Sequence, residues 1–409
     1  MKSFDVVVVG AGPAGGHCAR LLAKAGRKVL LVERYENFSV NSFSSAGTPI
    51  ETLAKFDLPN EVIGSFWKGI KIVTTNLNET WKSSKLLGVV LDFSKLKEYL
   101  ANQVIAHGGE VWMGCFYLKK VEEDQTIIVL KSKKEGEIRV TAKVLVDATG
   151  PSRAVMYNKK EEQPFFYSGT GIEYLIEVEE EDYEKQCDQL TFFLGHKWMP
   201  KGYSWVFPME KFKLKVGAGS LNSQHELIPN PEPIKYYIEL IIKEYIKPKS
   251  YKILEIHGGT LKYSKGLKDN YYKNNIIAIG DAVSTVNFLG GEGIRHGMHS
   301  AEIAFKYINQ YLDGELVDFK NYQQEMYKVF YKKWIISEKL GMKKYLLDSD
   351  SLVDRSITYL KFLNIDEIVD LLFNYKFESF SKIFLIRLAV KSLSFLRKSL
   401  SLSFFSSKY

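Results

Sequence analysis

A glycine-rich segment near the N-terminus places the strongest constraint on how this chain folds. Residues 10–15 read Gly-Ala-Gly-Pro-Ala-Gly, follow the apolar run Val6 to Val9 and precede an apolar helical stretch at 21–23. The glycines therefore stand at a turn between a buried strand and a helix, where the backbone approaches a pyrophosphate and the helix N-terminus faces its charge. The cofactor contacts predicted here are Gly10, Gly12, Pro13, Ala14 and Gly15.

A second buried run completes a nucleotide-binding βαβ unit. Residues 28–32 (Lys-Val-Leu-Leu-Val) end at Glu33 and Arg34, which we include among the cofactor contacts. A carboxylate after this strand accepts hydrogen bonds from the two ribose hydroxyls of an adenosine. The unit alone does not separate NAD from FAD, because both cofactors use the same fingerprint.

Two later segments favour FAD. Residues 147–150 read Asp-Ala-Thr-Gly, and Gly280 and Asp281 follow the buried strand 275–279. That position puts a carboxylate at the C-terminal end of a strand, where open parallel sheets bind ligands, and an aspartate there can hold a ribityl chain. The contacts predicted in these two segments are Asp147, Gly150, Gly280 and Asp281.

A further glycine run, 290–293, opens a long helix that we expect to extend to about Leu312. Glycines let this helix begin against a flavin ring, and its positive end favours the negative charge of a reduced flavin. Gly291, Gly293 and Ile294 are therefore predicted cofactor contacts.

Composition limits the kinds of binding partner and the cellular compartment that the sequence predicts. The net charge of +8 comes without an Arg-rich run, so we expect anionic cofactors and an anionic membrane surface as partners and no nucleic acid. Cys18, Cys115 and Cys187 are too few for a disulfide framework or a metal site, which fits a reducing compartment. Because a strand begins directly after residues 1–3, we expect no signal peptide and a cytoplasmic location.

The C-terminal region suggests peripheral membrane contact. No window of 18 uncharged apolar residues predicts a spanning helix, but residues 377–409 mix apolar side chains with many cations and one acid. Such a segment suits the headgroup layer of a membrane, or it packs on the protein with solvated lysines. The cations are Lys382, Arg387, Lys391, Arg397, Lys398 and Lys408.

The order of apolar patterns predicts an α/β fold with a discontinuous cofactor domain. A Rossmann-like FAD-binding domain occupies 1–160 and 265–315, and a mostly antiparallel β-sheet substrate domain, 161–264, is inserted between its parts. Residues 316–409 are expected to form a helical C-terminal region.

These segments, together with residues 200–208 (Pro-Lys-Gly-Tyr-Ser-Trp-Val-Phe-Pro), resemble the geranylgeranyl reductase group of FAD-dependent oxidoreductases. That group belongs with the aromatic hydroxylases in one flavoprotein superfamily, and the resemblance covers about residues 1–315. It implies reduction of isolated double bonds in long prenyl chains, with a Tyr-x-Trp-x-Phe-Pro strand walling the substrate channel. Many members carry a Cys-Gly pair where residues 45–48 read Ser-Ala-Gly-Thr, which weakens any transfer of cysteine-dependent chemistry.

Five residues are candidates for the reaction itself. Tyr203, Trp205 and Phe207 share one strand face by period two and can form a dry slot for an apolar chain, or simply sheet core. Arg295 and His296 follow the helix start and are candidates for stabilising charge near the ring or the substrate. His296 and His299 have a metal-like spacing, but no third ligand is in view, so no metal is predicted. No second nucleotide fingerprint exists for NADPH, so the electron donor is NADPH visiting transiently or another protein.

Several activities remain open on this evidence. The leading hypothesis is an FAD-dependent reductase of double bonds in a prenyl or other lipid substrate. One alternative is a non-redox carotenoid cyclase of the lycopene type that uses reduced FAD. Another is an FAD-dependent monooxygenase or halogenase, although the chain lacks the first tryptophan of the halogenase Trp-x-Trp-x-Ile-Pro pattern. The last alternative is a flavoprotein that serves as a non-catalytic scaffold.

Overall fold

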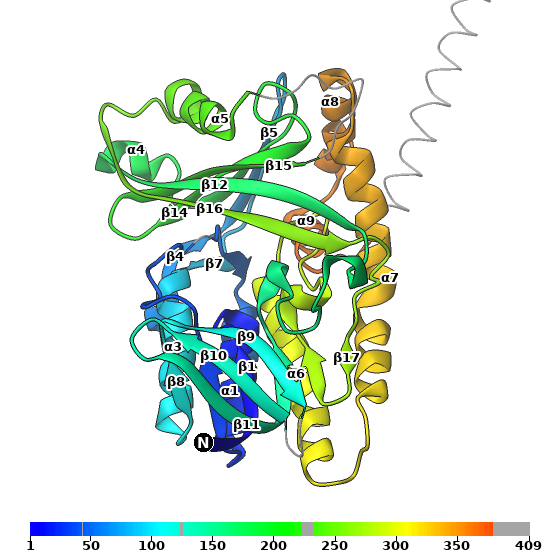
Figure 1. Cartoon of the computed structure of the whole chain (residues 1–409). Coiled ribbons are helices and arrows are strands. Elements are labelled where there is room, and N and C mark those ends of the chain that lie inside the picture. The colour runs from blue at the N-terminus through cyan, green and yellow to red at the C-terminus, as the bar shows by residue number, and fades with distance from the viewer. Residues whose placement is uncertain (43, 123–125, 223–231, 379–409) are drawn as a thin grey trace, which may run out of the picture.

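The computed structural model of the chain describes residues 1–42, 44–122, 126–222 and 232–378. Three β-sheets and their covering helices make up this part of the chain, and Figure 1 shows the second sheet stacked at one end of the first. The predicted α/β fold class is confirmed. The basic run 382–398 lies outside the described residues.

The first sheet is the predicted nucleotide-binding sheet. Its parallel strands follow the order β18-β11-β1-β2-β8, and the valines of β1 are almost completely buried, as expected for strands covered on both faces. Short β17 pairs antiparallel at one edge, while β9 and β10 extend the first half of β11 as an antiparallel meander. The bounds are β1 (Lys2–Val9), β2 (Val29–Val32), β8 (Glu110–Trp112), β9 (Cys115–Glu122), β10 (Thr126–Ser132), β11 (Gly136–Asp147), β17 (Tyr272–Lys273) and β18 (Ile276–Ala278).

Three helices pack together beside this sheet. Helix α1 (Pro13–Lys24) connects β1 to β2, and it lies against both α3 (Phe93–Ala106) and α6 (Ile294–Leu312). Helix α3 begins at Asp92, whose carboxylate accepts the N–H groups of Ser94 and Lys95 at 3.1 Å. The start of α6 lies next to the start of α1, since a Cβ at Gly297 would lie 3.3 Å from the Ala14 Cβ, although about 280 residues separate the two helix starts.

The second sheet has the order β16-β12-β15-β14-β13-β5-β6 and is antiparallel except for the pair β13 and β5. Strands β5 and β6 come from within the range 1–160 that we assigned to the cofactor domain, so the second sheet is not confined to 161–264. The domain boundaries otherwise remain a prediction. The bounds are β5 (Gly69–Val73), β6 (Asn78–Lys82), β12 (Phe166–Val178), β13 (Gln189–Phe193), β14 (Gly202–Met209), β15 (Lys213–Leu221) and β16 (Tyr251–Ser264).

A small third sheet, β3-β7-β4, lies between the two large ones, and short helices complete the loops (Figure 1). The bounds are β3 (Gly47–Pro49), β4 (Ile63–Trp67), β7 (Gly88–Leu91), α2 (Glu51–Lys55), α4 (Glu180–Glu184) and α5 (Ile234–Ile241).

The C-terminal helices connect the first sheet to the second. Long α7 (Lys320–Tyr345) runs along one side of the molecule from the first sheet to the second (Figure 1). Tyr322 at its start donates to the Ala278 carbonyl at 2.6 Å, and Tyr345 at its end stacks on Tyr203. Helices α8 (Asp350–Thr358) and α9 (Ile365–Leu372) pack on the second sheet through one apolar cluster. Among the described helices, none has an apolar stretch long enough to cross a membrane.

Candidate active site

The glycine-rich turn before α1 is packed directly on the Ala148 turn that follows β11. Gly10 has φ of +103°, and a Cβ there would lie 2.3 Å from the Ala148 carbonyl oxygen. A Cβ at Gly15 would lie 1.9 Å from the Gly10 carbonyl oxygen. Gly12 differs, because a Cβ there would meet no protein atom within 4 Å. The turn is thus tight on its inner side and open at Gly12.

Gly12 opens into a cavity of about 670 Å³, here called the glycine-lined cavity. Four of the five predicted cofactor segments contribute to it, because the carboxyl ends of β1, β11 and β18 meet at one sheet edge. The predicted contacts that line it are Gly12, Pro13, Ala14, Gly150, Gly280, Asp281, Gly291, Gly293 and Ile294. Gly10, Gly15, Glu33, Arg34 and Asp147 are not among its lining residues.

Asp281 presents a buried carboxylate to this cavity. Its Oδ1 accepts the Val286 N–H at 3.0 Å and the Thr285 hydroxyl at 3.3 Å, and burial raises the pKa of the carboxyl. Its Oδ2 has no hydrogen-bond partner in the described part of the chain. An acceptor remains available in the cavity, as a ligand hydroxyl would require.

A buried ion pair stabilises the turn after β18 that carries Asp281. Arg153 Nε lies 2.8 Å from Asp269 Oδ1, and both side chains are almost fully buried. Arg153 also donates to the Ser284 hydroxyl at 2.9 Å, and that hydroxyl donates to Asp269 at 2.5 Å. The turn after β11 and the turn after β18 are therefore locked together.

Glu33 stands at the end of β2 with its carboxylate facing the first turn. Oε2 accepts the Ala11 N–H at 3.0 Å, and Oε1 accepts the Tyr35 N–H at 3.0 Å. Each oxygen retains a second lone pair for a ligand. Arg34 beside it is exposed, with its guanidinium 4.7 Å from the centroid of the Tyr35 ring.

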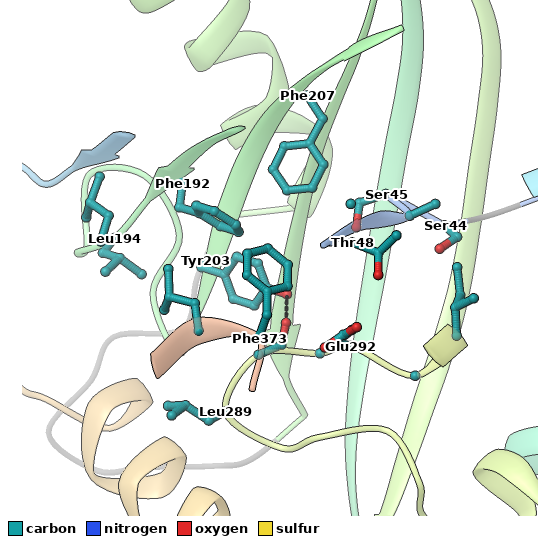
Figure 2. Close-up of a pocket in the computed structure, with 18 of the residues that line it drawn as sticks. Ser44, Ser45, Thr48, Phe192, Leu194, Tyr203, Phe207, Leu289, Glu292 and Phe373 are labelled. Carbon is teal, nitrogen blue, oxygen red and sulfur yellow. Dashed lines mark hydrogen bonds between the residues drawn. The ribbon is translucent and has the colours of Figure 1, made fainter. Parts of the chain in front are cut away.

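Beside the glycine-lined cavity lies an aromatic cavity of about 850 Å³. Figure 2 shows Phe192, Tyr203, Phe207 and Phe373 converging on it from the second sheet and from the end of α9. Phe192 packs edge-on against Phe207, with ring centroids 5.2 Å apart. The two cavities share the lining residues Ser44, Gly291, Gly293 and Ile294.

A second apolar cavity, of about 710 Å³, lies on the other side of Tyr203. It too meets the glycine-lined cavity at Gly291, and Trp205 lines it. The Tyr203 hydroxyl donates to the Gly290 carbonyl at 3.0 Å, which fixes the ring between the two apolar spaces. Trp205 Nε1 donates to the buried Glu173 carboxylate at 2.8 Å. The three predicted strand residues therefore divide over two cavities: Phe207 lines the aromatic cavity, Trp205 the second, and Tyr203 both.

Comparison with known proteins identifies the family. Residues 5–156 match a family model described as FAD dependent oxidoreductase, and residues 170–261 match the geranylgeranyl reductase catalytic domain. A digeranylgeranylglycerophospholipid reductase of Haloferax volcanii is 30% identical over 318 residues, which cover 74% of this chain and 75% of that protein. The chain belongs to the geranylgeranyl reductase family of FAD-dependent oxidoreductases.

Other members of the geranylgeranyl reductase family match over more of the chain. A digeranylgeranylglycerophospholipid reductase of Picrophilus torridus is 25% identical over 381 residues, 90% of this chain and 93% of that protein. The crystal structure of a geranylgeranyl bacteriochlorophyll reductase-like protein from Thermoplasma acidophilum has a TM-score of 0.82 at 23% identity. It covers 97% of this chain and 100% of that one, and at this identity the likeness shows the fold.

In this member of the reductase family, Arg295 and His296 are not among the residues that line the three cavities described above, and their role near the ring or the substrate stays a prediction. Arg295 Nε lies 3.0 Å from Glu292 Oε1, and its Nη1 donates to Asn374 at 2.9 Å while Nη2 donates to the Phe373 carbonyl. His296 Nε2 lies 3.2 Å from Glu292 Oε2, and burial against aromatic rings lowers its pKa. Both side chains contact the Glu292 carboxylate and hold it in place.

Asp147 also acts within the protein. Its carboxylate is fully buried and accepts hydrogen bonds from the Thr149 N–H and hydroxyl and from the N–H groups of Val155 and Met156, at 2.6 to 3.1 Å. These bonds shape the turn that carries Gly150 to the cavity wall. Asp147 therefore holds the shape of this turn, and its own side chain does not line the glycine-lined cavity.

Two charged residues that line the aromatic cavity were missed by the sequence analysis. Glu292 stands inside the glycine run and lines the aromatic cavity. Burial alone would raise its pKa, but His296 and Arg295 outweigh that effect and lower it, so it is a carboxylate. The sequence did carry a signal for Glu292, because it is the one acidic residue in the glycine run 290–293. Lys344 of α7 lines the same cavity, and nothing in the local sequence pointed to it.

Proposed function

We propose that this chain reduces carbon-carbon double bonds of a prenyl lipid at FAD bound in the glycine-lined cavity. The observation that carries the proposal is that two apolar cavities border the glycine-lined cavity and share Gly291 with it as a lining residue. A long unsaturated chain needs dry space next to the cofactor, and water must be excluded there. The relatives from Haloferax and Picrophilus are named as reductases of a digeranylgeranyl phospholipid, which is a substrate of this kind.

The residues of the cavity fit FAD in three respects. The open side of Gly12 admits a pyrophosphate close to the backbone, and the start of α1 has no side-chain cap to occupy its N–H groups. Asp281 Oδ2 is available to ribityl hydroxyls, and Glu33 retains lone pairs for adenosine ribose hydroxyls. Gly291, Gly293 and Ile294 border both the cofactor space and the aromatic cavity, where the ring would lie.

Reduced FAD, when bound, would supply a hydride for the double bond, and a nearby acid or a water molecule would supply the proton. The side chains of the chain itself position the substrate and keep water out. Phe192, Phe207 and Phe373 supply apolar walls from three separate segments. Tyr203 keeps its proton because burial raises its pKa to about 12, and its hydroxyl holds Gly290 in place at the cofactor edge.

We infer that electrons reach FAD from NADPH or from a reduced protein that binds transiently. The sequence has one Gly-x-Gly-x-x-Gly unit, and the fold uses it for the first turn of the glycine-lined cavity. Anaerobic mixing with NADPH and, separately, with a reduced ferredoxin tests this, with bleaching of the flavin absorbance as the readout. If neither reduces the flavin while dithionite does, both proposed donors are wrong.

The function is tested by incubating the anaerobically reduced protein with a digeranylgeranyl phospholipid and analysing the lipid by mass spectrometry. We expect products that gain two hydrogens for each double bond reduced. An isomer of unchanged mass would instead indicate a cyclase, and a product carrying an added oxygen after aeration would indicate a monooxygenase.

We also propose that the protein contacts anionic membranes peripherally through its C-terminal segment. The support is the sequence: five cations between Lys382 and Lys398 interrupt apolar residues, and each contributes about 1 kcal/mol near an anionic surface. Full-length protein and a form ending at Glu378 should differ in co-sedimentation with anionic vesicles, while both retain FAD. Equal sedimentation of both forms contradicts this role.

A further inference from the structure

A cation stands in the wall of the aromatic cavity without an acidic partner. Among the described residues that line this cavity, Lys344 is the only cation and Glu292 the only carboxylate. Glu292 is already engaged by Arg295 and His296. Within the described part of the chain, the contacts of the Lys344 ammonium are with aromatic faces: it lies 5.1 Å from the Tyr345 ring centroid and 5.9 Å from that of Tyr203.

This environment is unusual for a lysine. Burial lowers the pKa of Lys344 to about 8, and no neighbouring charge contributes to the shift. The titratable groups around it are the phenols of Tyr203 and Tyr345, whose pKa values are raised by burial, and Glu292 in the same cavity. A half-buried ammonium without a counter-ion is costly, and an anion arriving with a ligand would offset that cost.

The position of Lys344 within the cavity indicates which part of a ligand it meets. Tyr345, the next residue, donates its hydroxyl to the Leu289 carbonyl at 2.5 Å. Figure 2 shows Leu289 and Leu194 on the opposite side of the cavity from Ser44 and Thr48. Ser44 also lines the glycine-lined cavity, so Leu289, to which the end of α7 is hydrogen-bonded, lies across the aromatic cavity from the Ser44 part of that border.

We propose that Lys344 binds the phosphate of an anionic prenyl substrate while the prenyl chain extends through the aromatic cavity toward the glycine-lined cavity. The proposal rests on the proposed function and specifies its substrate class. Lys344 is then a specificity-determining residue, with the cation at one end of the cavity, aromatic walls in the middle and the cofactor border at the other end. The cation–π contacts with Tyr203 and Tyr345 hold the ammonium in place before the ligand arrives.

Matched ligands and variants test the proposal. Geranylgeranyl diphosphate and geranylgeraniol share one prenyl chain and differ in charge, and digeranylgeranylglyceryl phosphate separates a lipid headgroup from a free prenyl phosphate. The variants are Lys344→Met, which keeps the length without the charge, Lys344→Arg, and Lys343→Met as a control at an exposed neighbour. Binding is measured by perturbation of the oxidised flavin spectrum, which needs no turnover.

We expect Lys344→Met to weaken binding of a phosphorylated ligand about 10- to 100-fold, the loss of one charge-assisted hydrogen bond. Binding of geranylgeraniol should be unchanged, Lys344→Arg should retain phosphate binding, and Lys343→Met should resemble the unmodified protein. An effect on only one of the two phosphorylated ligands would identify the source. Equal losses for charged and neutral ligands, or none, would overturn the proposal.

A pH series distinguishes a charge role from a packing role, because ligand preference would not depend on pH if Lys344 only packed against its neighbours. Lys344 is protonated below its pKa of about 8, so the preference for the phosphorylated over the neutral ligand should hold below pH 8 and decline above it. In Lys344→Arg the preference should persist at high pH. If no ligand is reduced but the charge preference still depends on Lys344, the proposed reaction fails while the phosphate site stands.

Discussion

The glycine-lined cavity and the aromatic cavity share a border but are built in different ways. The first is built on the turns after β1, β11 and β18, and Gly10 and Gly15 in the first of these turns have no room for a Cβ. The second is made of side chains from segments far apart in sequence, among them Phe192, Lys344 and Phe373. In the proposed function, a constrained backbone holds the cofactor, whereas replaceable side chains form the substrate space.

This difference predicts different responses to substitution. A change on the backbone-built side should damage the fold or cofactor affinity whichever substrate is tested. A change on the side-chain-built side should alter substrate preference and leave FAD bound. The two sides meet at the glycine run 290–293, where Glu292 and Arg295 connect α6 to the end of α9.

The largest effect should come from breaking that connection. Arg295→Met leaves Glu292 buried with only His296 beside it and frees Phe373 and Asn374, so we expect a loss of about 3–5 kcal/mol in the free energy of unfolding. Chemical denaturation followed by tryptophan fluorescence measures it. The double variant Glu292→Gln with Arg295→Met removes both charges and should recover part of the loss. Unchanged stability of Arg295→Met would show that the two sides are not coupled here.

The next effect separates the fold from cofactor affinity. Gly12 has an ordinary φ of −66° and open space at its Cβ position, so Gly12→Val should fold. Its side chain would occupy the space proposed for the pyrophosphate, and FAD affinity should fall about 100-fold, or about 2.7 kcal/mol. Flavin fluorescence titration of the apoprotein measures this.

Gly10→Ala provides the contrast for Gly12→Val. Its Cβ would collide with the Ala148 carbonyl, so stability itself should fall. Normal FAD affinity in Gly12→Val would show that the pyrophosphate does not bind at Gly12.

The same contrast explains what sequence alone could predict. The strands around the first turn, the position of Asp281 and the start of α6 follow from local rules, because glycines and buried runs are required at fixed places along the chain. Tyr203, Trp205 and Phe207 were predicted to share one strand face, and all three line apolar cavities. These features depend on neighbours in sequence.

What sequence could not predict depends on distant segments. Strand β5 joins the second sheet by pairing with β13, more than a hundred residues later. Arg295 turns to Glu292 and Phe373 because α9 returns to this position, which no local pattern encodes. Ser44 reaches both cavities while its carbonyl accepts a hydrogen bond from Lys215 of β15 at 2.8 Å.

A moderate effect is expected at Asp281. Asp281→Ala removes the acceptor offered to the ribityl chain and should weaken FAD binding by about 1–3 kcal/mol, measured by equilibrium dialysis. Asp281→Asn keeps one acceptor oxygen and should lose less. Because Oδ1 also holds the Val286 turn, thermal unfolding of the apoproteins is the control for a general loss of structure. Unchanged FAD affinity in Asp281→Ala would remove this residue from the cofactor site.

The smallest effect tests whether Tyr203 acts as a wall or as an acid. Tyr203→Phe keeps the ring between the two apolar cavities and loses only the hydrogen bond to the Gly290 carbonyl, a cost of about 0.5–1.5 kcal/mol. Because burial raises the Tyr203 pKa to about 12, its hydroxyl is a weak proton donor, and kcat should change by no more than a few-fold. Tyr203→Ala, which joins the two cavities, should raise KM far more. A drop in kcat of about 100-fold in Tyr203→Phe, the size expected for a lost general acid, would instead assign the proton to this hydroxyl.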